Sequence, residues 1–200
     1  MNKYSGQWYL THKNLTPWAF MPDAFSVEEC NHIRKLAQSL PQETALVAAE
    51  TEGGEQRDSI RQNSLRWMNS SDPEQAWIFR KCTDLVLNLN QRFYGFDLDY
   101  IEILQFTEYH TVGDFYDDHM DFAHNGIHRR KLSFSIQLTD PSTYEGSDLE
   151  IVYGRDKKEV APRTQGTIIA FPSFQMHRVT ALEKGQRESL VGWVAGPPWR

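Results

Sequence analysis

Hydrophobic residues recur at helical spacing in the first half of the chain and at alternate positions in the second half. The first helical pattern begins after Ser26, which forms a capping box with Glu29 because each side chain can accept a hydrogen bond from the other residue's backbone. Pro41 ends this helix. Its apolar positions are Val27, Cys30, Ile33, Leu36, Ala37 and Leu40.

A second amphipathic pattern predicts a helix that begins with Asp72 as N-cap and Pro73 in its first turn. Gly95 is the expected C-cap. The apolar positions of this second helix are Ile78, Cys82, Leu85, Val86, Leu89 and Phe93. Between the two helices, residues 50–60 are polar and glycine-containing, so we interpret them as a mobile loop and a candidate lid.

From Tyr100 onward the hydrophobic period changes to two, which predicts β-strands. The first strand is expected to carry on one face Ile101, Ile103, Gln105, Thr107 and Tyr109. Further strands are predicted at 132–138, 149–153, 167–171, 176–179 and 189–194. Short strands separated by Asp-Pro, Gly and Pro turns predict a mainly β protein, a sandwich or jelly roll supported by the helices of the first half.

Composition places the chain among globular proteins and excludes several function classes. The 200 residues, 40% hydrophobic and 24% charged, suffice for one domain with a sizeable core. A net charge of −6 disfavours binding to nucleic acid or to an anionic membrane surface. There is no apolar run long enough to span a membrane and no signal-like N-terminus, and the two cysteines, both on helical apolar faces, are interpreted as core residues. We therefore expect a cytoplasmic protein.

The candidate chemistry centres on His119-Met120-Asp121. On an extended chain an imidazole and a carboxylate two residues apart point to the same side. His177 follows in a later predicted strand. Two histidines and one carboxylate can hold one face of an octahedral metal and leave the other positions open, as non-haem Fe(II) oxygenases require. An isolated His-x-Asp is more often a surface pair, so this hypothesis depends on further residues.

Arg187 and Ser189 are the first of these, because they share one face of the last predicted strand. A guanidinium beside a hydroxyl can bind a carboxylate, although a rim salt bridge is the alternative for Arg187. Tyr109 can donate to a bound anion from its hydroxyl, and a structural role fits it equally well.

A polar strand face supports an interior cavity. Ser133, Ser135 and Gln137 alternate with apolar residues, so they face either solvent or a wet interior. With the proposed metal strands beside them we favour the interior, and Gln137 becomes a candidate cosubstrate contact. The nearby histidines are interpreted as loop or surface residues, since three ligands already complete the metal site: His110, His124 and His128.

Three segments resemble the prolyl 4-hydroxylase-like branch of the Fe(II)/2-oxoglutarate-dependent oxygenases. They are residues 105–121 (QFTEYHTVGDFYDDHMD), 132–149 (LSFSIQLTDPSTYEGSDL) and 171–189 (FPSFQMHRVTALEKGQRES). The resemblance extends over about residues 23–193 and implies a single oxygenase domain over 1–200. Within it, residues 22–96 would form the helical support and residues 100–195 a double-stranded β-helix, which is a form of jelly roll.

The resemblance also implies the cofactors and their ligands. Fe(II) would be held by His119, Asp121 and His177, and 2-oxoglutarate by Arg187 with Tyr109 and Ser189 assisting. O₂ is the second cosubstrate, and ascorbate is a candidate reductant.

The implied reaction is hydroxylation of an unactivated C–H bond, coupled to oxidative decarboxylation of 2-oxoglutarate to succinate and CO₂. The expected substrate is a prolyl or other residue in a peptide or protein. A free amino acid or small metabolite is the alternative. Two alternatives come from other functional classes, a non-catalytic metal-binding jelly-roll sensor and a cupin-like isomerase. Neither requires an arginine positioned to bind a dicarboxylate.

For some residues in the strand before the second helix, contact with the substrate and a structural role are equally good interpretations. This strand often borders the substrate channel in the family that the chain resembles. The candidates are Arg61, Asn63 and Trp67, together with Tyr116 near the metal motif.

Overall fold

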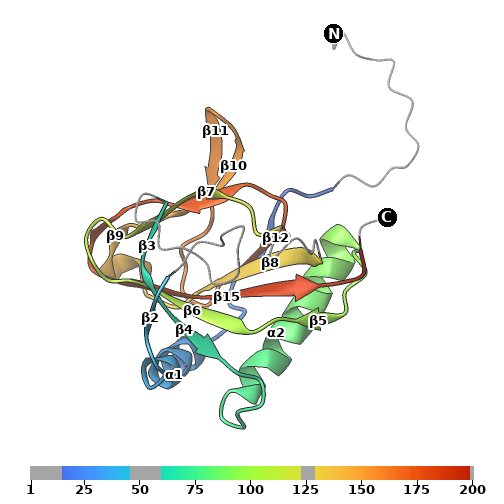
Figure 1. Ribbon diagram of the computed structural model, residues 1–200, viewed down its shortest axis with the longest axis horizontal. Coiled ribbons are helices and arrows are strands. Elements are labelled where there is room, and N and C mark those ends of the chain that lie inside the picture. Colours follow the sequence, from blue (N-terminus) through green and yellow to red (C-terminus); the bar gives the residue numbers. More distant parts are fainter. Residues whose placement is uncertain (1–14, 46–59, 123–128, 199–200) are drawn as a thin grey trace.

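The fold is seen in a computed structural model that describes residues 15–45, 60–122 and 129–198. The loop predicted at 50–60 therefore lies outside the described residues except for Ile60, and so do His124 and His128. Figure 1 shows two helices on one side of a layer of strands, with a second group of strands on the opposite side. Among the described residues no helix is long and apolar enough to cross a membrane.

The larger sheet is antiparallel and has eight strands within the described residues. Along its main path it runs β1 (Ala19–Met21), β12 (Ile168–Pro172), β8 (Arg130–Gln137), β15 (Arg187–Ala195), β6 (Leu104–Tyr109), β4 (Ser64–Met68) and β2 (Glu43–Thr44). The short β5 (Tyr100–Ile101) also pairs with β15. Most neighbours in this sheet are distant in sequence, as in a jelly roll.

The smaller sheet has five strands in the order β11 (Lys157–Val160), β10 (Leu149–Gly154), β13 (His177–Val179), β7 (Phe115–His119) and β3 (Arg61–Gln62). A separate pair joins β14 (Leu182–Lys184) to β9 (Glu145–Gly146). Apolar residues from both sheets form one buried cluster between them, including Tyr109, Ile169 and Phe171 from the larger sheet and Leu149 and Ile151 from the smaller. The predicted double-stranded β-helix with helical support is confirmed.

Helix α1 (Val27–Gln38) begins as predicted. Ser26 accepts from the backbone N–H of Glu29, and the Glu29 carboxylate accepts from the backbone N–H of Ser26. This reciprocal pair satisfies two donors that the first turn of a helix leaves open.

Helix α2 (Ala76–Leu89) begins later than predicted, so Asp72 is not its N-cap. The Asp72 carboxylate accepts from the backbone N–H of Glu74, and its carbonyl accepts from Gln75 and Ala76, which closes a local turn before the helix. A π-helical turn, η1 (Asn90–Tyr94), extends α2, and Gly95 ends it with φ of 67° as expected for a left-handed C-cap. A 3₁₀ turn, η2 (Pro141–Thr143), completes the helical elements of the described residues.

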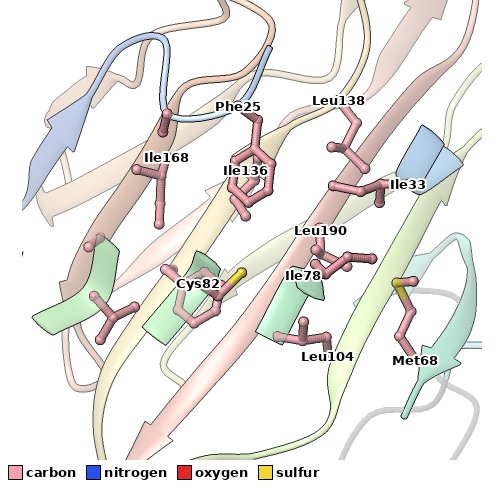
Figure 2. Packing of buried hydrophobic residues seen from close by; sticks show 14 of the residues in the cluster. Phe25, Ile33, Met68, Ile78, Cys82, Leu104, Ile136, Leu138, Ile168 and Leu190 are labelled. Atoms are coloured by element: carbon pink, nitrogen blue, oxygen red, sulfur yellow. The ribbon is translucent and has the colours of Figure 1, made fainter. Parts of the chain in front are cut away.

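The main core lies between the two helices and the larger sheet. Figure 2 shows Ile33 and Ile78 from the helices beside Ile136, Leu190 and Leu104 from the strands. Both cysteines are free and fully buried in this core, as predicted. Burial raises the pKa of the Cys82 thiol to about 12, which keeps it protonated and inert.

Gly192 in β15 shows how tightly this core is packed. A Cβ at this position would lie 2.3 Å from Cζ of Phe134 and 2.7 Å from Cδ2 of Leu104. We predict that Gly192→Ala destabilises the protein by about 2 kcal/mol through overpacking, measured by urea unfolding. The matched control is Gly154→Ala, where a Cβ meets nothing within 4 Å. Equal stability of the two variants would contradict this account.

The strand predicted to begin at Tyr100 is interrupted, so the prediction of one shared face is wrong for Ile101 and Ile103. The register against β15 shifts by one residue between β5 and β6. As a result Ile101 packs on the main core and Ile103 is exposed. Gln105 and its alternate neighbours in β6 keep the predicted shared face.

Two buried glutamates stand directly opposite each other, Glu108 in β6 and Glu188 in β15. Like charges in this arrangement repel, and buried charges require partners. Arg66 donates to Glu108 at 3.0 Å, and Arg34 from α1 pairs with Glu188. His110 lies 3.2 Å from the same Glu188 carboxylate, so it has a structural partner and is not simply a surface histidine. These ion pairs attach α1 to the sheet and link β4 to β6 within it.

The His110–Glu188 contact predicts a pH-dependent stability. The hydrogen bond that His110 donates to Glu188 raises the pKa of His110, burial lowers it, and the charges of Glu188, Glu108 and Asp114 add to the increase. A pKa raised on folding stabilises the protein below the ordinary histidine pKa of about 6.5, and this contribution is lost as pH rises through the folded value. We expect His110→Gln to destabilise the protein by about 1 kcal/mol or less at about pH 5.5.

The same substitution is expected to cost less at about pH 8.5, because the charged form of His110 is lost as pH rises through its folded pKa. Urea unfolding at the two pH values measures this difference. His32→Gln is the control, since His32 is an exposed residue of α1 that stacks on Trp77. A loss for His110→Gln that is equal at both pH values would show that packing, not charge, explains the contact.

Candidate metal centre

Strand pairing brings the two histidines together. His119, the last residue of β7, lies directly opposite His177, the first residue of β13, and their ring centroids are 4.1 Å apart. Asp121 lies two residues beyond the end of β7, and its side chain is on the same side as that of His119, as the spacing predicts. Its backbone N–H donates to the Ser173 carbonyl at 2.9 Å, which holds the carboxylate in place.

The three side chains converge on one point. Asp121 Oδ1 lies 3.8 Å from His119 Nε2, and Asp121 Oδ2 lies 3.6 Å from His177 Nε2. One potential ligand atom from each residue falls within 4.8 Å of the other two. All three side chains are largely buried.

Backbone carbonyls set the orientation of both imidazoles. His119 Nδ1 lies 2.7 Å from the Asp117 carbonyl, and His177 Nδ1 lies 3.0 Å from the Gln175 carbonyl. A carbonyl only accepts, so each Nδ1 carries the proton and each Nε2 presents its lone pair toward Asp121. This is the tautomer that metal-binding histidines adopt.

The electrostatics of the cluster favour the same protonation states. Burial, with the adjacent His177, lowers the pKa of His119 to about 3. Burial raises the pKa of Asp121, but the two histidines and a hydrogen bond from Ser133 outweigh it and bring the pKa below its ordinary value. At neutral pH the cluster therefore holds a neutral imidazole at His119 and an ionised carboxylate, which are the forms that bind metals.

Aromatic rings enclose the cluster on two sides. Tyr116 stacks on His119 with centroids 3.5 Å apart, and Phe171 lies 4.5 Å from His177. Ser133 and Ser173 contact each other at 3.0 Å beside Asp121. The donor set of two imidazoles and one carboxylate, in a shielded pocket, fits a divalent metal such as Fe(II).

Arg187 is fully buried at the other end of the same interior. Its Nη2 and Nε donate to Gln137 Oε1 at 3.0 and 3.3 Å, and Nη1 has no hydrogen-bond partner among the described residues. Ser189 is opposite Gln137, and Tyr109 is opposite Arg187 with its ring 5.4 Å from the guanidinium. An orphaned buried guanidinium N–H is the feature expected of a carboxylate site.

Tyr109 keeps its proton in this environment. Burial raises the pKa of its phenol, and the charges of Arg187 and Arg61 only partly offset the increase. The hydroxyl is therefore available as a donor to an anion beside Arg187.

The sequence model of the 2OG-Fe(II) oxygenase superfamily matches residues 104–195, a range that contains the three potential metal ligands and Arg187. The chain is therefore similar to this superfamily over that range. The name of this superfamily includes Fe(II) and 2-oxoglutarate. The histidine–aspartate cluster is chemically suited to Fe(II), and the buried Arg187 is suited to 2-oxoglutarate.

PKHD-type hydroxylases are among the curated relatives of this chain. One from Picosynechococcus sp. is 38% identical over 94 residues, which is 47% of this chain and 42% of the relative. Another from Synechococcus sp. is 40% identical over 79 residues, covering 40% of this chain and 36% of the relative. The chain thus spans less than half the length of these relatives.

Solved structures share the fold at low sequence identity. A Pseudomonas putida prolyl-4-hydroxylase has a TM-score of 0.72 at 17% identity, over 91% of this chain and 94% of that one. A Trichoplax adhaerens prolyl hydroxylase, solved with a peptide fragment of hypoxia inducible factor, has a TM-score of 0.73 at 13% identity, over 90% and 84%. These likenesses concern the fold alone.

The structure separates the four candidate substrate residues into two groups. Arg61 donates to Asn63 Oδ1 at 2.7 Å and its guanidinium lies 4.4 Å from the Tyr116 ring, so these three form one cluster next to His119. Trp67 is in β4 of the other sheet, and its Nε1 donates to Glu43. The Asn63 Nδ2 is buried and has no hydrogen-bond partner within the described part of the chain.

Sequence reasoning missed Trp193 and Arg130 near the metal cluster. Trp193 is opposite Ser133, and its buried Nε1 has no hydrogen-bond partner in the ranges that the structure describes. Arg130 lies 4.2 Å above the Trp193 ring and pairs with Glu102. Trp193 shares strand parity with Arg187 and Ser189, so that parity was the available signal. Arg130 had none, because it lies within the basic run at 128–131, a pattern typical of a solvated loop.

A second cluster of potential ligands, Glu108, His110 and Glu188, lies outside this pocket. Its carboxylates already pair with Arg66 and Arg34. Two guanidinium groups beside these carboxylates would repel a cation, so we assign the cluster a structural role.

Proposed function

We propose that this protein is an Fe(II)- and 2-oxoglutarate-dependent dioxygenase of the prolyl-hydroxylase type. The main observation behind this proposal is that the protein interior contains both a set of metal ligands and a buried arginine suited to 2-oxoglutarate. The His119, Asp121 and His177 donors converge at one end, and an unpartnered buried N–H of Arg187 lies deeper. A jelly-roll sensor or isomerase would need the first cluster but not the second.

In this proposal Fe(II) is held by His119, Asp121 and His177. The two histidines donate from Nδ1 to the Asp117 and Gln175 carbonyls, which leaves their Nε2 atoms available as metal ligands. The ion and 2-oxoglutarate together supply the oxidising chemistry, in which O₂ and 2-oxoglutarate yield succinate, CO₂ and one hydroxylated substrate carbon. The protein supplies orientation and a shielded pocket.

The second end of the pocket binds and orients 2-oxoglutarate. Arg187 neutralises the distal carboxylate, and Gln137 orients Arg187 by accepting from two of its nitrogens. Tyr109 and Ser189 lie beside Arg187 and Gln137 as further donors. Gln137 acts in this arrangement through Arg187, since its Oε1 is already occupied and its Nε2 donates to the Pro162 carbonyl.

We propose a residue within a peptide as the substrate. Two buried neutral donors, Asn63 Nδ2 and Trp193 Nε1, have no partner among the residues that the structure describes, and both lie on elements adjacent to the metal cluster. Neutral N–H donors suit carbonyl oxygens, which a peptide backbone offers at every residue. The peptide bound to the Trichoplax prolyl hydroxylase is consistent with this substrate class.

Anaerobic titration tests the proposal directly. Apo-protein is titrated with Fe(II) and then with 2-oxoglutarate, and a visible metal-to-ligand charge-transfer band is expected on the second addition. Normal Fe(II) binding without that band would mean that 2-oxoglutarate does not chelate this metal, which would overturn the dioxygenase assignment.

Succinate release then separates the substrate classes. Aerobic holoenzyme is given 2-oxoglutarate with prolyl peptides or with free amino acids. Stimulation by peptides and not by free proline is the expected result. Stimulation by the free amino acid alone would replace the peptide proposal with a metabolite-tailoring one.

A further inference from the structure

Thr167 places a second unpartnered donor at the Arg187 end of the interior. It is fully buried, and its Oγ1 has no hydrogen-bond partner among the described residues. A buried hydroxyl without a partner is costly, which indicates that something else satisfies it in the working protein.

The strand register fixes where this hydroxyl lies. The Gln137 backbone N–H donates to the Thr167 carbonyl at 3.0 Å, which continues the β8–β12 pairing in which Ile168 faces Ile136. Thr167 is therefore opposite Gln137. Alternation puts Thr167 on the same face as Ile169 and Phe171, whose side chains are in the cluster between the sheets. Directly opposite side chains on one face have Cβ atoms about 5 Å apart.

Gln137 thus stands between two strands that carry hydroxyls. Ser189 is opposite it on β15, and Thr167 is opposite it on β12. Gln137 itself occupies the Nε and Nη2 side of the Arg187 guanidinium. A carboxylate approaching Arg187 consequently finds Nη1 free but not the Nε–Nη2 edge through which arginine often binds both oxygens.

We propose that the Thr167 hydroxyl donates to the distal carboxylate of 2-oxoglutarate and acts as a second anchor beside Arg187 Nη1. This inference rests on the proposed function. One carboxylate has enough lone pairs for both donors, so a single ligand would satisfy two buried groups that the protein leaves open. The hydroxyl compensates for the guanidinium edge that Gln137 occupies.

Thr167→Val tests the anchor, because it removes the hydroxyl and preserves the branched shape. We expect the dissociation constant of 2-oxoglutarate for the Fe(II) protein, measured anaerobically by calorimetry, to rise roughly tenfold, as for a lost hydrogen bond to a charged group. Oxalate is the internal control, because it chelates metal but has no distal carboxylate. Its affinity is expected to stay unchanged.

Thr167→Ser keeps a hydroxyl and is expected to bind 2-oxoglutarate much more tightly than Thr167→Val. If the valine variant does not fold, Thr167→Ala replaces it in the same comparison. Thr83→Val on α2 is the remote control, since its hydroxyl bonds only to the Phe79 carbonyl within its own helix.

The outcomes separate this inference from the function on which it rests. Wild-type protein that binds Fe(II) and oxalate but not 2-oxoglutarate overturns both. Wild-type and Thr167→Val proteins that bind 2-oxoglutarate equally well overturn the anchor alone. A parallel loss of oxalate affinity would also overturn it, because the hydroxyl would then act on the metal end or on the fold.

Discussion

Replacing Asp121 with alanine is expected to abolish succinate release and to weaken Fe(II) binding by at least about 100-fold. Mutations that only support a metal ligand already cost 10–100-fold, so removal of a ligand costs at least that much. The carboxylate is the single negative charge in the cluster, and its two oxygens lie 3.8 and 3.6 Å from the two Nε2 atoms. Without it, two neutral imidazoles would face a divalent cation alone.

Stability distinguishes this loss from unfolding. The pKa of Asp121 is lowered in the folded protein, so its ionised form stabilises the fold, and we expect the metal-free Asp121→Ala protein to be somewhat less stable than wild type but still folded. Fe(II) affinity is measured by anaerobic calorimetry, turnover by succinate release and folding by thermal unfolding. Asp118→Ala is the matched control, a half-exposed carboxylate on β7 next to His119. Wild-type Fe(II) affinity in Asp121→Ala would refute the ligand assignment.

Replacing Arg187 with methionine is expected to weaken 2-oxoglutarate binding by roughly 100-fold and to leave Fe(II) binding unchanged. Removing one partner of a buried charge pair costs about 2–5 kcal/mol, and a factor of 100 corresponds to about 2.7 kcal/mol. Methionine fills a similar volume without charge. Because Arg187 contacts Gln137 and not the metal cluster, the two ends of the pocket should respond independently.

Arginine-to-lysine substitution sharpens the same test. Arg187→Lys keeps the charge but cannot keep the two donors to Gln137 Oε1, so an intermediate affinity is expected. The control is Arg92→Met on the exposed side of η1. The measurement is the charge-transfer titration with 2-oxoglutarate under anaerobic conditions. Unchanged 2-oxoglutarate affinity in Arg187→Met would exclude this arginine from the site, whatever the fate of turnover.

Parts of this fold that depend on neighbours in sequence were predictable. The capping box at Ser26 and Glu29 forms as expected, because all of its partners lie within one helical turn. The change from a helical period to a period of two marks where helices give way to strands. Gly95 at the left-handed C-cap is another local preference that the structure respects.

The errors arose where a local signal had two outcomes. Asp72 and Pro73 are suited both to a helix start and to a turn, and the turn forms because Asp72 caps Glu74 first. Ile103 fits strand alternation, but the register shift against β15 moves it to the surface.

The sequence by itself determined the residue types of the candidate site, the period of the strands and the helix that caps itself at Ser26. Only the tertiary structure decided which side chains meet. Gln137 orients Arg187, Glu108 opposes Glu188, and Thr167 faces the Arg187 pocket. The physical reason is that antiparallel pairing joins strands far apart in the chain, and one residue of register moves every side chain to the opposite face.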